Sequence, residues 1–343
     1  MPLRPLNLAI RGVGAVSPAG WTAADLARAV SGGSDPAIPG EETRREPGAP
    51  LVRLRRVPKP ATPLPFARES RLRRTSPIAQ YGVSAALEAL GGDRLAAIRA
   101  GALRVAVIGT IMNGCVNFSR RFYSEVLADP RTASPLIFPE TVFNAPSSHL
   151  SALIGSTAAN YTLVGDGAQF AAAFDLADQW LEAGEADGCL IVGAEELDWL
   201  SAEGAALLDR TLIVSEGAAA VYLERTEDGG AIQIEGPHPV TGKAARFRAA
   251  QAVSQSLTGG VTGSHTALFD GLSGSAGDRP ERQAFATWAG PRQSPKTVLG
   301  DGLGAAAGWQ IVAAHLWQTA HPESVAAVSC IGANQRAVGL LIG

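Results

Sequence analysis

The sequence predicts an α/β fold, and three features of the chain indicate it. Residues 161–196 have the pattern of an apolar strand, a Gly-Asp-Gly turn, a long alanine-rich helix and a second buried strand at 189–193. Strands also alternate with helices before and after this strand–helix–strand unit. The 343 residues are 46% hydrophobic and 18% charged, with abundant Gly and Ala, which is the balance of a compact α/β protein.

The part of the chain that precedes residue 226 contains most of the regular pattern. Period-2 alternation or continuous apolar runs indicate strands, and apolar residues at helical spacing indicate helices. The elements expected around the 161–196 unit are a strand at 6–16, a helix to about residue 30, an amphipathic helix at 76–90, a buried strand at 105–110, a loop leading into a helix at 134–153, a short helical stretch at 203–209 and a strand at 213–223.

A polar, Gly-rich turn at residues 225–230 predicts a weak boundary, after which the alternation is repeated in fewer residues. We therefore expect two layered α/β units that share one core, residues 1–225 and a shorter unit at 231–343. The elements expected in the second unit are strands at 231–235, 266–270, 324–329 and 337–342 and helices at 244–257, 279–288 and 304–319.

Residues 32–75 interrupt the first unit with an irregular excursion rich in Pro and basic residues. Helical and strand periodicity both disappear over residues 32–65, so little regular structure is expected there. The basic residues either lie on a solvated loop and helix entrance or form a docking surface for an acidic partner, and the sequence leaves both open. They include Arg53, Arg55, Arg56, Lys59, Arg68, Arg71, Arg73 and Arg74.

Charge and composition argue against several classes of function. The formal net charge of -3 provides no field that favours nucleic acid or an anionic membrane. No segment approaches ~18 consecutive apolar residues and no secretory signal is recognisable, so a cytoplasmic protein is expected. Three widely separated cysteines have no metal-ligand spacing, so neither a disulfide framework nor a metal site is expected.

A Gly-rich segment at residues 302–307 imitates part of a dinucleotide-binding fingerprint. A dinucleotide site needs a complete βαβ unit after the glycines, and only a short tail follows here. Close packing of a helix explains the small residues better. No cofactor is therefore expected.

Seven segments occur in the order found in the β-ketoacyl synthases, and the chain resembles that family over almost its whole length. They are RGVGAVSPAG, SPIAQYGVSAALEAL, FNAPSSHLSALIG, GEADGCLIVGAEE, SEGAAAVYLE, KTVLGDGLGAAAG and SCIGANQ. The resemblance implies the thiolase fold, with five αβαβα layers built from two similar halves and usually assembled as a dimer.

The catalytic groups of that family are a cysteine at the central strand–helix turn, which takes the acyl chain as a thioester, and two histidines that assist decarboxylation and condensation. On the resemblance, the cysteine position falls on Gly167. The first histidine position falls on Asp270 or Gly271, depending on a one-residue gap. The second falls on Asp301, in a segment that keeps the family's Lys296. All three catalytic positions are therefore changed.

A chain with this loss resembles the chain-length factors, the non-catalytic halves of ketosynthase heterodimers. The resemblance implies an active ketosynthase as partner, a role in shaping the acyl tunnel in polyketide, aryl-polyene or related fatty-acyl biosynthesis, and possible contact with an acyl-carrier protein. The better-known aromatic polyketide factors carry Gln at the lost-cysteine position, whereas here Gln169 lies two residues beyond it. Phe143, Asn144, His149, Phe170 and Phe174 are expected at the interface or tunnel, with core packing equally compatible for the last two.

Two other functions remain open. The chain could be a diverged acyltransferase or condensing enzyme with a relocated nucleophile, for which Cys115 and Cys330 are the candidates, although buried structural thiols are far commoner. It could instead be a scaffold that binds a carrier protein through the basic excursion. Cys189 lies within an apolar strand and is expected in the core.

Overall fold

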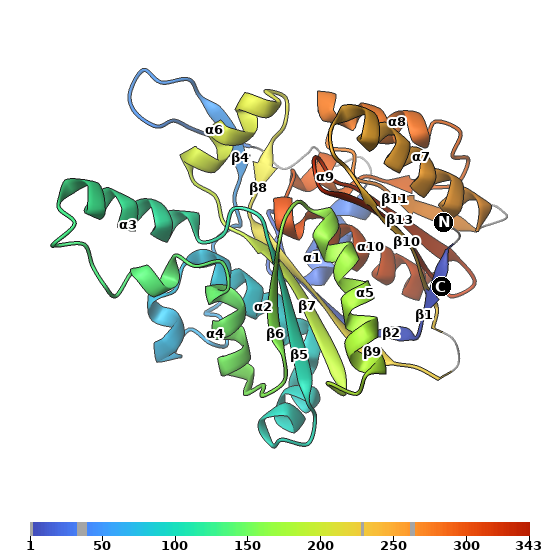
Figure 1. The fold of residues 1–343 in the computed structure, drawn as a ribbon, viewed down its shortest axis with the longest axis horizontal. Coiled ribbons are helices and arrows are strands. Elements are labelled where there is room, and N and C mark those ends of the chain that lie inside the picture. The colour runs from blue at the N-terminus through green and yellow to red at the C-terminus, as the bar shows by residue number, and fades with distance from the viewer. Residues whose placement is uncertain (1–2, 33–39, 228–229, 261–264) are drawn as a thin grey trace.

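Two β-sheets with helices between them and on both outer faces make up the molecule (Figure 1). This computed structural model describes residues 3–32, 40–227, 230–260 and 265–343. No helix in these ranges is long and apolar enough to cross a membrane. The two sheets lie face to face around one layer of helices, so that both contribute to a common core.

The first sheet has five strands, and its centre is completely buried. Apart from Glu195 at the end of β7, parallel strands β5 and β7 consist of apolar and small residues, as expected for strands covered on both faces. Strand β9 turns the sheet antiparallel towards β2, while β6 forms the other edge. The order is β2 (Leu8–Val16), β9 (Gly217–Arg225), β7 (Gly188–Glu195), β5 (Val105–Ile111) and β6 (Asn160–Val164).

The second sheet combines the C-terminal part of the chain with the first strand of the N-terminus. Strand β1 pairs antiparallel with β10, so the single strand expected at residues 6–16 is in fact divided between the two sheets. The order is β1 (Arg4–Leu6), β10 (Ile232–Pro239), β14 (Arg336–Ile342), β13 (Val325–Ile331), β11 (Thr266–Phe269) and β12 (Arg292–Gln293).

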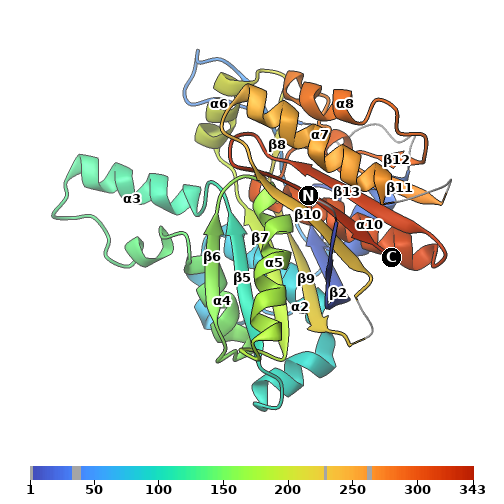
Figure 2. The ribbon, with the colours of Figure 1, turned by 45° about the vertical axis from the view of Figure 1, so that its right-hand side comes forward.

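Helices α1 (Ala23–Ser31), α5 (Ala168–Glu182) and α10 (Ala306–Ala320) lie between the sheets (Figure 2). Their alanine-rich sequences allow close packing against both sheets, and the largest hydrophobic cluster is centred on them. The fully buried Trp309 fastens α10 to the first sheet, because its indole N–H donates to the carbonyls of Val16 and Ala218 at 3.1 and 2.9 Å.

The outer faces of the sheets are covered by two further helix pairs. Helices α2 (Pro77–Arg99) and α4 (Ala145–Ile154) pack on the first sheet, and α7 (Lys243–Gly259) and α8 (Arg279–Ala284) pack on the second. Helix α2 is interrupted at Gly91, where φ is 70°, close to the predicted helix end at residue 90. These layers form a five-layer αβαβα thiolase-like fold, and this prediction is confirmed.

Helix α3 (Val116–Ala128) was not predicted. Together with the segment up to η2 (Phe138–Glu140), it extends away from the body as an arm (Figures 1 and 2). Val116 is the only residue of α3 that is buried. The apolar side chains of the helix therefore do not pack on the core, and Tyr123 and Leu127 remain exposed.

Part of the excursion is more regular than predicted. Strands β3 (Glu41–Thr43) and β4 (Val52–Arg55) form a small sheet with β8 (Val214–Ser215). Buried Arg55 anchors this sheet by donating to the carbonyls of Thr297 and Val298 at 3.3 and 2.9 Å. The expectation of an irregular segment is thus wrong for β3 and β4, while residues 33–39 lie outside the described ranges. The 3-10 helix η1 (Ser70–Arg74) follows.

Most other expected strands and helices occur within a few residues of their predicted bounds. The division into residues 1–225 and 231–343 stays a prediction, because β1 belongs to the second sheet and both sheets pack on the same helices. The remaining short elements are α6 (Trp199–Leu208), η3 (Ala276–Asp278), α9 (Pro295–Leu299) and η4 (Leu303–Ala305).

Candidate functional site

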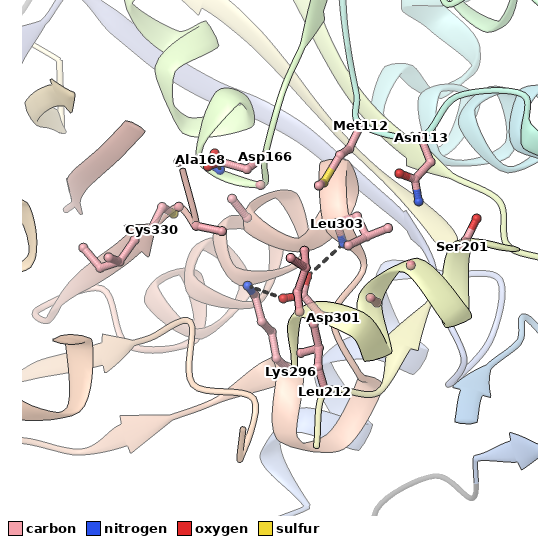
Figure 3. A pocket seen from close by; sticks show the side chains of 18 of the residues that line it. Met112, Asn113, Asp166, Ala168, Ser201, Leu212, Lys296, Asp301, Leu303 and Cys330 are labelled. Carbon is pink, nitrogen blue, oxygen red and sulfur yellow. Dashed lines mark hydrogen bonds and ion pairs between the residues drawn. The ribbon is translucent and has the colours of Figure 1, made fainter. Parts of the chain in front are cut away.

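A cavity of about 530 Å³ lies where the N-terminus of α5 meets α6, α9, η4 and the end of β13 (Figure 3). Three positions singled out from the sequence line it, namely Gly167, Asp301 and Cys330, and so does Lys296. Side chains from α6 close one side. The fold therefore brings Gly167 and Asp301, the positions predicted to replace a catalytic cysteine and a histidine, to one cavity.

The central turn presents no reactive side chain to this cavity. Gly167 precedes the first residue of α5, and a Cβ built on it would lie only 2.9 Å from the carbonyl oxygen of Leu303. Its neighbour Asp166 is buried and accepts hydrogen bonds from the backbone N–H groups of Asn334 and Gln335, both at 3.2 Å. The turn is therefore fixed to the β13–β14 connection through Asp166, while Gly167 leaves no room for a side chain.

Lys296 and Asp301 form an ion pair, with Nζ 3.1 Å from Oδ2 (Figure 3). The other carboxylate oxygen, Oδ1, accepts the N–H of Leu303 at 2.9 Å. Burial lowers the pKa of Lys296, but the carboxylates of Asp301 and Glu281 outweigh it and hold the pKa above its ordinary value. Lys296 and the Leu303 N–H thus occupy both carboxylate oxygens of Asp301, so this residue is not a free acid–base group.

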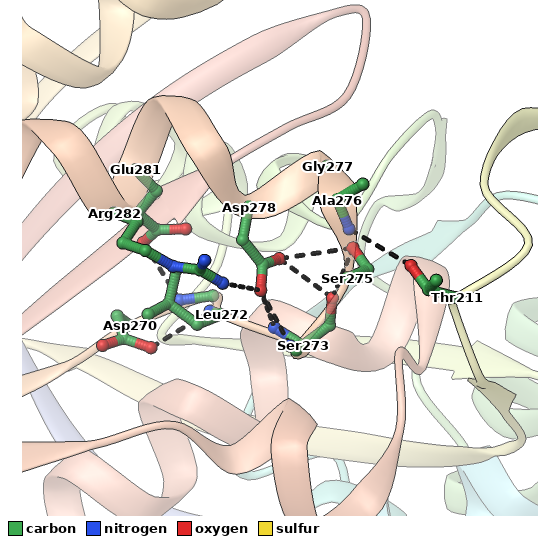
Figure 4. Close-up of polar contacts among 12 residues, drawn as sticks. Thr211, Asp270, Leu272, Ser273, Ser275, Ala276, Gly277, Asp278, Glu281 and Arg282 are labelled. Carbon is green, nitrogen blue, oxygen red and sulfur yellow. Dashed lines mark hydrogen bonds and ion pairs between the residues drawn. The ribbon is translucent and has the colours of Figure 1, made fainter.

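Asp270 is fully buried at the end of β11 and forms an ion pair with Arg292 of β12. Its Oδ1 accepts the N–H of Leu272 at 3.0 Å (Figure 4). Of the two positions left open for the first histidine, Asp270 carries a side chain and Gly271 contributes only its backbone N–H, which Glu281 accepts at 3.0 Å. Neither residue lines the cavity.

Glu281 is a buried acid that the sequence analysis missed. Burial and the nearby charge of Asp270 raise its pKa to about 7, against the opposing effects of the Gly271 hydrogen bond and Lys296. Figure 4 shows it beside the loop that follows β11, which Asp278 holds by accepting the N–H groups of Ser273 and Gly274 at 3.0 and 2.7 Å. No local pattern marks Glu281, because Glu is common in the first turn of exposed helices.

The cysteines occupy environments that suppress thiolate formation. Burial, reinforced by neighbouring carboxylates, raises the pKa of Cys115 and of Cys330 far above the ordinary range. Cys330 lines the cavity but is only 3% exposed, and Cys115 is 2% exposed. Cys189 lies in the core, and burial raises its pKa to about 12. An activated nucleophile needs the opposite conditions, an accessible thiol with a lowered pKa.

A family model described as "Beta-ketoacyl synthase, N-terminal domain" matches residues 7–229. The chain belongs to the β-ketoacyl synthase family. A search of curated proteins finds no sequence match.

Several solved ketosynthase structures share the fold at low sequence identity. The ishigamide ketosynthase/chain length factor is 19% identical, with 98% of this chain and 99% of that chain covered and a TM-score of 0.75. The ketosynthase ApeO in complex with its chain length factor ApeC, from Xenorhabdus doucetiae, is 16% identical, with 98% of each chain covered and a TM-score of 0.76. A type II acyl-carrier protein in complex with its ketosynthase, AntDE:AntF, is 16% identical, with 100% of each chain covered and a TM-score of 0.74.

The residues that the sequence assigned to an interface or tunnel of this ketosynthase-family chain lie in different environments. Phe143 and Asn144 are exposed, and His149 is partly buried with its Nε2 2.9 Å from a carboxylate oxygen of Glu140. Phe170 and Phe174 are fully buried in the core between the sheets. The assignment to an interface is therefore corrected for these two, because their side chains do not reach the surface and core packing accounts for them.

A second missed residue, Glu195, organises the first-sheet side of the cavity. It is fully buried at the end of β7 and accepts the backbone N–H groups of Met112, Asn113 and Gly304, the last at 3.3 Å. Two of these residues belong to the segment after β5, and the third belongs to η4. One carboxyl group therefore joins the two walls that carry Met112 and Leu303.

Stability should fall as the pH rises, because burial raises the pKa of Glu195 to about 8 in the folded chain. The stabilisation is complete below the unfolded-state pKa of 4.5 and is lost as the pH rises through about 8; it amounts to on the order of 5 kcal/mol. Denaturant unfolding across this pH range measures the pH dependence of the free energy of unfolding. Glu195→Gln should flatten the profile, whereas Glu185→Gln, at an exposed site, should not. An unchanged profile in Glu195→Gln would contradict the assignment.

Proposed function

We propose that this chain is a non-catalytic, chain-length-factor type subunit that pairs with an active ketosynthase and shapes the acyl tunnel in polyketide, aryl-polyene or related fatty-acyl biosynthesis. The observation that carries the proposal is the state of the three family catalytic positions. Gly167 has no side chain, and Asp270 and Asp301 are held in ion pairs with Arg292 and Lys296.

The chemical requirements of the condensation reaction also support a site without catalytic activity. A thioester requires a thiolate, which Gly167 cannot supply and which burial of Cys330 disfavours. Decarboxylation of an extender develops negative charge on an enolate, and neutral or positive hydrogen-bond donors stabilise such charge. Asp270 and Asp301 supply no such donor, because both are carboxylates held in ion pairs and Asp270 does not line the cavity. Every step would thus depend on residues of a partner.

The exposed apolar surface supports pairing with another subunit. Strand β6 is an edge of the first sheet, and Tyr161 and Val164 on it are 55% and 47% exposed. Long exposed apolar edges are usually covered in native assemblies. In both views the arm projects from the side of the molecule on which β6 lies (Figures 1 and 2). It adds further exposed apolar side chains, namely Tyr123, Leu127, Leu136 and Phe138.

Co-expression with an active ketosynthase from the same source tests the pairing. A stoichiometric heterodimer should co-purify, and Val164→Asp should weaken it by about tenfold or more, because a charge would be buried against the partner. Leu207→Asp is the matched control, since Leu207 is 85% exposed on α6. Size-exclusion chromatography and titration measure the pairing. A stable homodimer that is indifferent to the ketosynthase would contradict the proposal.

A carrier-protein scaffold is a second candidate, and the basic surface favours it. Among the described residues, Lys59, Arg68, Arg71, Arg73 and Arg74 are exposed and form no ion pair. Arg53 and Arg56 of the same excursion, by contrast, face Glu42 and Glu41 at 3.6 and 3.3 Å. The unpaired group provides positive charge for an acidic partner. The two roles are compatible, since the basic surface and the β6 edge involve different segments.

A further inference from the structure

Helix α6 turns one face towards the cavity along its whole length. The residues of α6 that line this space recur at intervals of four, which places them on a single side of the helix. They are Leu200, Ser201, Gly204, Ala205 and Leu208. In Figure 3, Ser201 of α6 lies across the cavity from Cys330. The helix therefore separates the cavity from the solvent on this side.

Little packing holds α6 on the body of the molecule. All ten residues of α6 are described, and Ala202 alone among them is buried. Together with the partly buried Ala205 and Ala206, it packs on the small cluster formed by strands β4 and β8. The larger side chains point elsewhere, because Leu207 and Leu208 are 85% and 87% exposed. Alanine methyl groups bury little apolar surface, so the hydrophobic effect contributes little to the position of this helix.

Asp198 holds the N-terminal end of α6 through both of its carboxylate oxygens. Its Oδ1 caps the helix by accepting the N–H groups of Leu200 and Ser201 at 2.9 and 3.1 Å. Its Oδ2 accepts the Nε–H of Arg120 of α3 at 2.6 Å, and the Asp198 side chain is only 6% exposed. Hydrogen bonds between charged groups are the stronger kind. The start of α6 is therefore fastened to the arm.

The C-terminal end of α6 has a second polar attachment. Asp209 follows the helix, and its Oδ2 accepts the N–H of Gly277 in η3 at 2.9 Å. Between the two aspartates lies Gly204, where an added Cβ would meet no atom within 4 Å, so packing does not require a glycine there. Glycine weakens the interior of a helix relative to alanine. The position of α6 therefore depends mainly on its two ends.

We propose that α6 is a lid over the cavity, that the arm holds it closed through Arg120 and Asp198, and that it opens by local unfolding. A helix of this length is marginal in water by itself, so it does not persist once it leaves the body. Opening removes one side of the cavity and exposes Cys330 on the other side. The lid is a property of this chain alone, so it goes beyond pairing with a ketosynthase and does not depend on it.

Alkylation of Cys330 reports on the lid, because this thiol lines the cavity and is only 3% exposed. The full chain is treated with iodoacetamide, and peptide mass spectrometry gives the rate at Cys330. Arg120→Gln should raise this rate by about tenfold, since a charged hydrogen bond to Asp198 is lost. Hydrogen–deuterium exchange of residues 199–208 should rise in parallel. Arg121→Gln is the matched control, because Arg121 pairs with Glu125 within α3 and should change neither rate.

A second variant acts on the lid itself and leaves the arm intact. Gly204→Ala adds a methyl group that meets no atom within 4 Å, so the variant should fold and its α6 should be more stable as a helix. Both the alkylation of Cys330 and the hydrogen exchange of α6 should therefore slow by about fivefold. Thermal unfolding checks that each variant is folded. Exchange in the buried strand β7 should stay unchanged and serves as the reference for global stability.

Cys330 alkylation that is unaffected by both Arg120→Gln and Gly204→Ala overturns the proposal. Faster exchange in α6 without faster alkylation of Cys330 also overturns it, because the helix would then unfold without opening the cavity. If Arg120→Gln destabilises the whole chain, the result with Gly204→Ala decides. Failure to pair with a ketosynthase would leave the lid standing, whereas unchanged rates in variants that pair normally would remove the lid and leave the proposed function.

Discussion

Incubation of this chain with acyl-coenzyme A or acyl-carrier protein should leave its mass unchanged, and in a heterodimer the acyl group should appear only on the partner. Gly167 offers no nucleophile, and burial raises the pKa of the Cys115 and Cys330 thiols. Replacing the partner's nucleophilic cysteine by alanine should lower the condensation rate by on the order of a thousandfold or more. Intact-protein mass spectrometry and product analysis measure both effects.

Matched variants of this chain sharpen that prediction. Cys115→Ala and Cys330→Ala should leave the condensation rate of the complex unchanged. Gly167→Cys should not create activity, because its Cβ would meet the carbonyl oxygen of Leu303 at 2.9 Å and carboxylates occupy both histidine positions. An acyl adduct on this chain that disappears in Cys115→Ala or Cys330→Ala would instead support the diverged acyltransferase.

Arg292→Met should destabilise the chain by about 3 kcal/mol, the second large effect expected. Asp270 is fully buried, and removing Arg292 leaves its carboxylate without the opposing charge. The double variant Asp270→Asn with Arg292→Met should recover much of the loss, because a neutral amide costs less to bury. Denaturant unfolding of the single and double variants provides the measurement.

The control for this pair is Arg282→Met. Arg282 of α8 is 60% exposed and lies 3.6 Å from Asp278 of η3, so its loss should cost less than about 1 kcal/mol. If Arg292→Met cost as little stability as Arg282→Met, the ion pair would not be what holds Asp270 in place.

The layered fold could be predicted from the sequence because its determinants are local. The apolar strand at 189–193, the Gly-Asp-Gly turn and the alanine-rich helix are each continuous in the sequence. The spacing of their apolar residues and the turn residues themselves therefore indicate the local structure. The candidate catalytic positions could be predicted for the same reason, since motifs within their own segments place them on Gly167 and Asp301. Helix α3 was not predicted, and its position as an arm that packs little against the body is set by the tertiary structure.

Burial and pairing could not be predicted in this way. Whether Phe170 and Phe174 face a partner or the core depends on the second sheet, which the chain forms more than fifty residues later. Glu195 meets Gly304, and Asp270 meets Arg292, only after distant segments are brought together. The sequence by itself thus determined the element pattern and predicted that the family's catalytic residues are replaced. The tertiary structure decided which charges are compensated, because pKa and ion pairing depend on neighbours in space rather than along the chain.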